Sequence, residues 1–205
     1  RSGSKNRYHD IEKSSTKNKK TLKRFKKRLK LLNEQIAEIE KEMAEVVSSD
    51  PELVAKMKYL QSIPGVSFIA SATVVAETLG FSNISSAKQL TSFVGYDVVI
   101  KESGKYKGKS KISKKGNKHI RAVLHMPSMT AVRVNPTLKP FYNRLKSTKE
   151  KPIVGLVATQ RKLLILLYTL WRKEEYYDPD ILKKEAASSK ELAAQDSAPI
   201  MEITS

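Results

Sequence analysis

The stretch "IVGLVATQRKLLILLYTLW" (residues 153–171) is the most apolar segment of the sequence and decides what kind of fold the chain can form. It is about long enough to cross a membrane, but Gln160, Arg161 and Lys162 interrupt it near its middle. We therefore expect a helix over residues 152–173 that is apolar on most sides and forms the centre of a soluble core.

The composition indicates a soluble protein whose partner is a polyanion. A chain of 205 residues allows one or two domains and can bury a real core. Lysine and arginine total 39 against 21 acidic residues, which gives a formal net charge of +18. Because such a surplus repels itself, nucleic acid is the expected partner, and a membrane surface is the weaker interpretation.

Few residues are suited to thiol or metal chemistry. The sequence contains no cysteine, which excludes disulfides, a thiolate nucleophile and a cysteine zinc site. Its three histidines, His9, His119 and His125, are too scattered to indicate a metal site. No secretory signal precedes the basic start, so the cytosol is the expected compartment.

An amphipathic helix is predicted over residues 21–48, after a flexible basic lead-in over residues 1–20. Apolar residues recur there at alternating spacings of three and four: Leu22, Phe25, Leu29, Leu32, Ile36, Ile39, Met43 and Val46. This pattern is typical of a coiled-coil arm that joins subunits, and a helix packed on its own domain is the alternative. Basic residues dominate 23–30 and glutamate 34–45, so an antiparallel partner or a phosphate backbone would suit the basic end.

A helical hairpin is predicted next. Asp50 and Pro51 fit the start of one helix, and a tight Pro-Gly turn at Gly65 separates it from the small-residue helix "FIASATVVAETLG" (68–80). This order resembles a helix-hairpin-helix, whose turn amides can hold a DNA phosphate, so Gly65 is a candidate nucleic-acid contact. Ser67 stands where that motif usually has a second glycine, and a plain helical hairpin is the alternative.

The rest of the domain is predicted as helices around one extended element. Further helix boundaries are expected at Gly95, Asn117 and Asn135, with a bend near Pro127. β-Branched residues and alternating polarity between residues 96 and 113 favour a strand pair or an extended loop. The fold class is therefore mainly α: a coiled-coil arm, then a compact helical domain over 50–178 with a small basic hairpin, then a disordered tail over 179–205.

The segment "ESGKYKGKSKISKKGNKHIR" (102–121) is the strongest nucleic-acid signal. From residue 101 to 121 the chain has eight lysines and one arginine against a single glutamate. In one extended strand, alternate lysines at 105–111 would point to one side and follow a phosphate backbone. A flexible charged loop without a fixed partner is the alternative. The candidate contacts are Lys101, Lys105, Lys107, Lys109, Lys111, Lys114, Lys115, Asn117, Lys118 and Arg121.

Ser103 is the candidate nucleophile in this segment. A hydroxyl needs a base, a metal or a strongly electrophilic setting before it attacks. Gly104 would let the backbone of a substrate approach closely, and the neighbouring lysines could stabilise charge on an attacked phosphate. No Ser-His-Asp arrangement can be read from the spacing, so a turn serine is the alternative.

Three blocks of the chain resemble a known family: "LQSIPGVSFIASATVVAETLGFSNISSAKQLTSFVGYD" (60–97), "ESGKYKGKSKISKKGNKHIRAVLHMPS" (102–128) and "KPIVGLVATQRKLLILLYTLWRKEEYYDP" (151–179). They are similar to the C-terminal transposase domain of the IS-one-ten / IS-eleven-eleven insertion-sequence transposases. The heptad arm is similar to the coiled coil that precedes this domain in the family.

The resemblance implies a function. Family members join a RuvC-like domain with four acidic, Mg²⁺-binding residues to this serine-bearing domain, act as dimers or tetramers in the bacterial cytosol or nucleoid, and use a structured guide RNA to select DNA. The family's serine lies in a Ser-Gly pair upstream of a Lys-Gly-Asn-Arg block. Here these are Ser103-Gly104 and "SKKGNKHIR" (113–121), so the resemblance implies that Ser103 attacks a DNA phosphodiester.

Two departures from the family pattern limit this expectation. We find no RuvC-like segment in the sequence, and therefore expect no bound cofactor and a chain that binds nucleic acid without completing recombination by itself. Tyr96 and Val98 stand where the family often has leucine and proline. The alternative function is a non-catalytic helix-hairpin-helix protein that binds nucleic acid.

Overall fold

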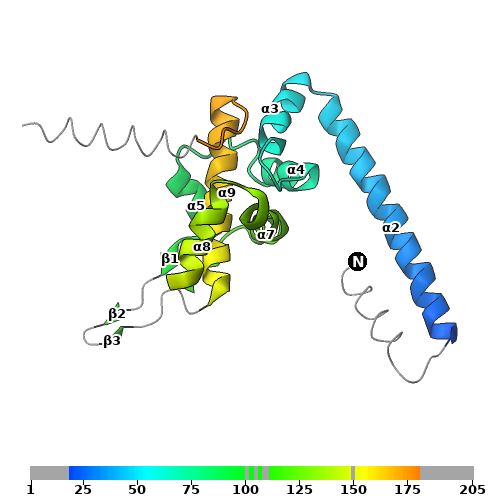
Figure 1. Ribbon diagram of the computed structural model, residues 1–205. Helices are drawn as coiled ribbons and strands as arrows, with labels where there is room; N and C mark the ends of the chain where they lie inside the picture. The colour runs from blue at the N-terminus through cyan, green and yellow to red at the C-terminus, as the bar shows by residue number, and fades with distance from the viewer. Residues whose placement is uncertain (1–18, 100–101, 104–105, 108–110, 149–150, 181–205) are drawn as a thin grey trace, which may run out of the picture. The chain divides into compact units, whose positions relative to one another are not determined.

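The computed structural model describes residues 19–99, 102–103, 106–107, 111–148 and 151–180 (Figure 1). The chain divides into two compact units, one up to Val54 and the other from Ala55 onward. Most described residues are helical, so the predicted mainly α class is confirmed. The lead-in expected over residues 1–20 and the tail expected over 179–205 lie almost entirely outside the described residues.

The first unit consists mainly of one long helix, α2 (Lys19–Ser48). It covers the residues of the predicted arm, so the apolar spacing correctly indicated a helix. Two ion pairs, each between residues one turn apart, stabilise its polar side: Lys30–Glu34 at 3.7 Å and Lys41–Glu45 at 3.6 Å. Along the apolar seam, Ile39 is 54% exposed and Val46 is 69% exposed.

The helical hairpin consists of α3 (Pro51–Gln61) and α4 (Phe68–Glu77). The Asp50 carboxylate accepts hydrogen bonds from the amides of Glu52 and Leu53, at 3.0 and 3.1 Å, which confirms the predicted cap. The Ser67 hydroxyl accepts a bond from the Ala70 amide and caps α4. The serine that departs from the helix-hairpin-helix pattern therefore has a local reason to be there.

After α4 the chain forms α5 (Ala87–Val94) and four two-residue strands. Ser86 caps α5, and Gly95 ends it with a φ of +80°, a conformation that favours glycine. The strands form two antiparallel pairs, and the predicted extended element is confirmed. They are β1 (Val98–Val99) with β4 (Lys111–Ile112), and β2 (Glu102–Ser103) with β3 (Tyr106–Lys107).

Four further helices complete the described domain: α6 (Lys118–Val123), α7 (His125–Val134), α8 (Leu138–Thr148) and α9 (Pro152–Lys173). The break between α6 and α7 falls at Leu124, three residues before the bend expected at Pro127. Pro127 occupies the first turn of α7, where its missing amide proton costs no helical hydrogen bond. The Asn135 side chain accepts bonds from the amides of Thr137 and Leu138 at the start of α8.

Helix α9 is the centre of the core, as its apolar sequence predicts. Figure 1 shows it running behind α8 through the domain. It is long and apolar enough to cross a membrane, but most of it is buried inside the domain, which marks it as a core helix. Its fully buried leucines include Leu163, Leu164, Leu167 and Leu170. Gly155 allows α8 to come close, because a Cβ there would lie 3.3 Å from the Tyr142 ring.

The residues after α9 pack back against earlier parts of the domain. The Tyr177 amide donates a 2.8 Å hydrogen bond to the Ser62 hydroxyl, and its own hydroxyl donates to the Asn135 side chain at 2.9 Å. The ring of Tyr176 packs edge-on against Tyr59, with the centroids 5.0 Å apart. These contacts connect the end of the described chain to the end of α3 and to the start of α8.

Candidate nucleic-acid interface

The segment "SKKGN" (113–117) is fixed to the C-terminal end of α5 by backbone hydrogen bonds. The Ser113 amide donates to the Asp97 carbonyl at 2.7 Å, and the Lys114 amide donates to the Gly95 carbonyl at 3.1 Å. The Asn117 amide donates to the Phe93 carbonyl at 2.9 Å. Residues 113–117 therefore form a loop that is anchored by its backbone, which we call the anchored loop.

Two glycines make this close crossing possible. Gly116 has a φ of +151°, and a Cβ on it would lie 2.8 Å from the Gly95 nitrogen, too close for any other residue without a shift of the backbone. A Cβ on Gly95 would lie 2.9 Å from the Lys115 carbonyl oxygen. The glycines that frame the lysines are therefore required by backbone packing.

The Arg121 side chain connects the anchored loop to the end of α5. Its Nη1 donates to the carbonyl oxygens of Val94, at 2.6 Å, and of Gly116, at 3.2 Å. A third bond, of 3.3 Å, reaches the carbonyl of Asn117. Arg121 therefore has a structural role that its position in a basic run does not indicate, and its contact with phosphate stays a prediction.

Asn117 is likewise engaged inside the protein. Its side-chain oxygen accepts the amides of His119 and Ile120, at 2.9 and 3.0 Å, so the predicted cap of α6 is confirmed. Its side-chain nitrogen donates to the Glu77 carboxylate of α4. The side-chain nitrogen that would donate to a phosphate thus has a protein partner. The predicted nucleic-acid contact of Asn117 stays a prediction.

Four predicted contacts carry exposed side chains on this anchored framework, and we call them the basic platform: Lys111, Lys114, Lys115 and Lys118. Lys114 has a φ of +55°, a left-handed conformation that is uncommon for a residue with a side chain. No acidic residue lies between Lys111 and Lys118 in the sequence. The platform therefore presents a fixed set of cations whose phosphate contacts would be sensitive to salt.

The other predicted lysines are described only partly. Lys101, Lys105 and Lys109 lie outside the described residues, and for Lys107 the backbone alone is described. Between the paired positions Val99–Lys111 and Glu102–Lys107, one side has two residues and the other has three. In an antiparallel ladder without a bulge, both strands have the same number of residues between two paired positions. The two described strand pairs are therefore offset from each other, and the alternation of lysines from 105 to 111 stays a prediction.

Ser103, the predicted nucleophile, lies on β2 opposite Tyr106 of β3. Its partner Gly104 lies outside the described residues. In the sequence the β2–β3 pair lies between β1 and β4, and β4 includes Lys111 of the basic platform. Its role as a nucleophile stays a prediction.

Gly65 has a structural explanation that is independent of nucleic acid. Its φ is +97°, and a Cβ there would lie 3.1 Å from both the Pro127 carbonyl oxygen and the Ala131 nitrogen of α7. The Pro-Gly turn therefore packs against the backbone of α7. Phosphate binding by this turn stays a prediction.

A buried polar chain links Tyr96, Gln160 and His125, and no sequence pattern predicted it. The Tyr96 hydroxyl donates to the Gln160 side-chain oxygen at 3.1 Å, and the Gln160 nitrogen lies 3.1 Å from Nδ1 of His125. Burial raises the pKa of Tyr96 far above its usual range, and the charge of Arg121 opposes this shift only partly. The polar residue within the apolar run 153–171 was the available signal, because a buried glutamine needs partners.

The described residues do not supply the carboxylate set that magnesium binding would need. In that part of the chain, no three side chains of histidine, cysteine, aspartate or glutamate lie together so as to hold a metal ion. Asp97 is half-buried and has no other carboxylate within such a group. No step of the chemistry is therefore assigned to a metal in this domain.

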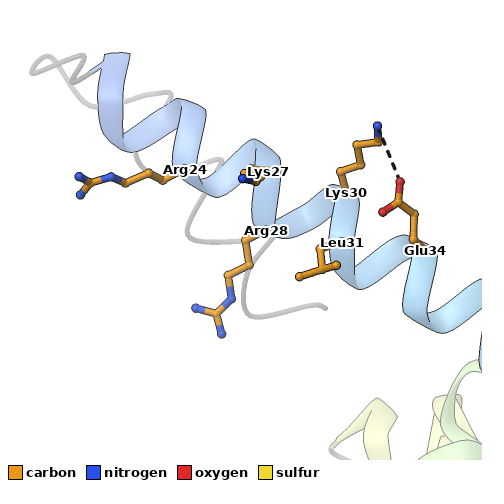
Figure 2. A pocket seen from close by; sticks show the side chains of 6 residues that line it. All are labelled: Arg24, Lys27, Arg28, Lys30, Leu31 and Glu34. Carbon is orange, nitrogen blue, oxygen red and sulfur yellow. Dashed lines mark ion pairs between the residues drawn. The ribbon is translucent and has the colours of Figure 1, made fainter.

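The first unit has a basic surface of its own. Figure 2 shows a pocket along the N-terminal half of α2, where the side chains of Arg24 and Arg28 extend from one side of the helix. Lys30 is paired with Glu34 next to it. The full lining is Arg24, Lys27, Arg28, Lys30, Leu31 and Glu34. A phosphate backbone and an acidic partner helix would both suit this surface.

Comparison with known proteins points to one family. Residues 57–143 match the model of the Transposase IS116/IS110/IS902 family. The chain is 24% identical over 119 residues to the insertion element IS900 uncharacterized 42 kDa protein of Mycobacterium paratuberculosis, covering 58% of this chain and 30% of that protein. It is 26% identical over 137 residues to the pilin gene-inverting protein of Moraxella bovis, covering 66% of this chain and 42% of that protein.

A second pilin gene-inverting protein, from Moraxella lacunata, matches to the same extent. The chain thus spans between 30% and 42% of the length of these relatives. The matched region runs from α3 to α8 and includes the strands, the anchored loop and Ser103. Through this domain the chain is similar to the IS116/IS110/IS902 family of transposases.

Proposed function

We propose that this chain is the DNA-binding and strand-transfer part of a transposase or recombinase that acts on DNA in the cytosol. The observation that carries the proposal is the basic platform, whose lysines are fixed to the end of α5 by Gly95, Gly116 and Arg121. A fixed set of exposed cations is suited to a backbone that presents phosphates at regular spacing. The similarity to a transposase family supports DNA as that backbone.

Ser103 is the proposed nucleophile. Its oxygen would attack the phosphorus of a DNA phosphodiester, form an Oγ–P bond and displace one of the two sugar oxygens as a hydroxyl. The serine proton would pass to a general base and from there to the departing sugar oxygen. Lysines of the basic platform would balance the negative charge that builds up on the phosphate oxygens.

The proposed partners go beyond this domain. We expect a structured guide RNA to select the DNA, and a dimer or tetramer joined through the seam of α2. Magnesium would be bound by an acidic RuvC-like domain, where it would lower the charge of the attacked phosphate. A guide-directed reaction therefore needs that domain in addition to the residues described here.

A covalent-adduct experiment tests the nucleophile. The chain, supplemented with the acidic domain of a relative, magnesium, guide RNA and end-labelled target DNA, is denatured and separated by size. We expect a labelled protein band that Ser103→Ala abolishes and that Ser113→Ala, a matched change in the anchored loop, retains. An adduct that survives Ser103→Ala would show that another residue attacks.

A binding experiment tests the platform separately. Replacing Lys114 and Lys115 with glutamine removes two exposed charges from the loop without touching its backbone bonds. If each contacts a phosphate, the slope of log affinity against log salt should fall by roughly 1.8 for B-DNA. An unchanged slope would remove the platform from the interface. Tight binding that never yields an adduct would favour the alternative, a non-catalytic nucleic-acid-binding protein.

A further inference from the structure

A second group of cations lies on α8 and α9, outside the sequence segment 101–121. The Lys162 amino group of α9 lies 4.3 Å from the centroid of the Phe141 ring of α8. The Arg144 guanidinium of α8 lies 5.7 Å from the centroid of the same ring. One half-buried aromatic ring thus holds two cations from two helices.

The sequence around this group, as far as the structure describes it, is strongly basic. Of the described residues from 133 to 162, none is acidic, and seven are basic: Arg133, Lys139, Arg144, Lys146, Lys151, Arg161 and Lys162. Within the described part of the chain, neither Arg144 nor Lys162 forms an ion pair. Burial, and then the charge of Arg144, lowers the pKa of Lys162, so the protein holds two like charges near each other at a cost.

An anion between the two side chains would reverse that cost. It would attract both cations and would leave the ring in place as their common apolar support. Arg144 could present a planar fork of donors to a phosphate, and Lys162 a compact charge beside it. Phosphate in a nucleic-acid backbone is the anion that a strongly basic protein of a transposase family meets.

We propose that Arg144 and Lys162, held over the Phe141 ring, form a second contact site for a backbone phosphate of double-stranded nucleic acid. The site is distinct from the basic platform and from Ser103, and it extends the interface onto α8 and α9. It rests on the proposed function, because it takes nucleic acid as the partner. Its task is to position the duplex, since a phosphate contact carries no base sequence information.

The test measures binding of the whole chain to a labelled 30-base-pair duplex DNA by fluorescence anisotropy over a series of salt concentrations. The cluster variant is Arg144→Gln with Lys162→Gln. The matched control is Lys58→Gln with Arg172→Gln, which removes the same charge from exposed positions, including an arginine that lies over the ring of Tyr168. The platform variant Lys114→Gln with Lys115→Gln is measured in parallel.

We expect the cluster variant to lower the salt slope by up to roughly 1.8, about 0.9 for each phosphate contact, and the control to leave it unchanged. Arg144→Lys with Lys162→Arg keeps both charges and should retain most of the slope. If the cluster variant has a lowered melting temperature, Lys162→Gln alone should still lower the slope by about 0.9. A wild-type slope in the cluster variant, or an equal fall in the control, would overturn the proposal.

The measurements on the platform variant and on the wild-type chain distinguish a failure of this proposal from a failure of the proposed function. A fall in the platform variant with none in the cluster variant would reject only the second site. Absence of any duplex binding by the wild-type chain would reject both. Repeating the series with duplex RNA of the same sequence identifies the source of the phosphate: an effect of the cluster variant on RNA alone assigns the site to RNA, and an effect on both assigns it to the shared backbone.

Discussion

The backbone of Gly116 crosses that of Gly95 so closely that a Cβ on Gly116 would lie 2.8 Å from the Gly95 nitrogen. This crossing joins the end of α5 to the loop that carries the basic platform. It depends only on backbone hydrogen bonds and on the lack of a side chain at both glycines. It nevertheless determines where Lys114 and Lys115 can lie.

Replacing Gly116 with alanine should therefore destabilise the domain. The new Cβ would press on the backbone of Phe93 and Gly95, and the φ of +151° would strain the alanine. We expect a loss of about 3 kcal/mol in the free energy of unfolding, measured by urea denaturation. Gly80→Ala is the control: its φ is +63° and its Cβ would meet Trp171 at an ordinary 3.4 Å, so the loss should be about 1 kcal/mol.

Arg121→Lys tests whether Arg121 acts mainly as a structural residue. Lysine keeps the charge but cannot reproduce the hydrogen bonds of Nη1 to the carbonyls of Val94 and Gly116. The free energy of unfolding should fall by about 2 kcal/mol. Lys118→Gln, an exposed change one turn earlier, should stay within about 0.5 kcal/mol of the wild type. Full stability of Arg121→Lys would show that these bonds contribute little.

Asn117→Asp should create a stability defect that depends on pH. Aspartate still caps α6, but its carboxylate would replace the amide that donates to Glu77. At neutral pH the two carboxylates repel each other, and we expect a loss of about 1–2 kcal/mol. The loss should shrink as the pH falls towards about 4, where one carboxyl takes up a proton. Adding Glu77→Gln should restore stability at pH 7, and a defect that persists there would contradict the explanation.

Tyr96→Phe should remove part of the stability loss at alkaline pH. The raised pKa of Tyr96 keeps its hydroxyl protonated in the folded chain while the unfolded chain ionises at the ordinary value. Its contribution is therefore fully present below about pH 10 and is lost as the pH rises further. The variant should be about 1 kcal/mol less stable at pH 8, through loss of the bond to Gln160. The difference should narrow above about pH 10, as measured by denaturation at several pH values.

Substitutions on α2 test association through the arm. Leu29→Asp with Ile36→Asp puts two charges on the apolar seam, where a partner helix would bury them. We expect the mass measured by light scattering to fall to that of a monomer. Leu31→Asp with Ala37→Asp introduces the same charge outside the seam and should leave the mass unchanged. An unaltered mass in the seam variant would show that α2 does not join subunits.

The fold was largely predictable because its signals are local. Pro152 and the apolar run after it define α9, whose bounds are as expected. Asp50, Asn117 and Asn135 each cap the helix that they were expected to cap. These residues act on amides two or three positions away, so the neighbouring sequence contains all the information that is needed.

The interface was predictable only as a concentration of charge. The sequence gives the number of charged side chains but not the direction in which each one points. Arg121 donates to three carbonyl oxygens of the protein, whereas Lys118, three residues earlier, is exposed. The group of Phe141, Arg144 and Lys162 requires α8 and α9 to pack against each other, which no local pattern shows. The offset between the two strand pairs has no counterpart in the simple alternation of the sequence.

The anchored loop also has an energetic consequence for binding. A loop that is disordered before it binds must lose backbone entropy on contact with its ligand, and that loss weakens the affinity. Residues 113–117 have already lost it on folding, through their bonds to α5. The lysines of the platform then give up only side-chain freedom, about 0.5–1.5 kcal/mol for each one that is immobilised. The glycine crossing thus makes the surface preorganised, so that more of each phosphate contact remains as affinity.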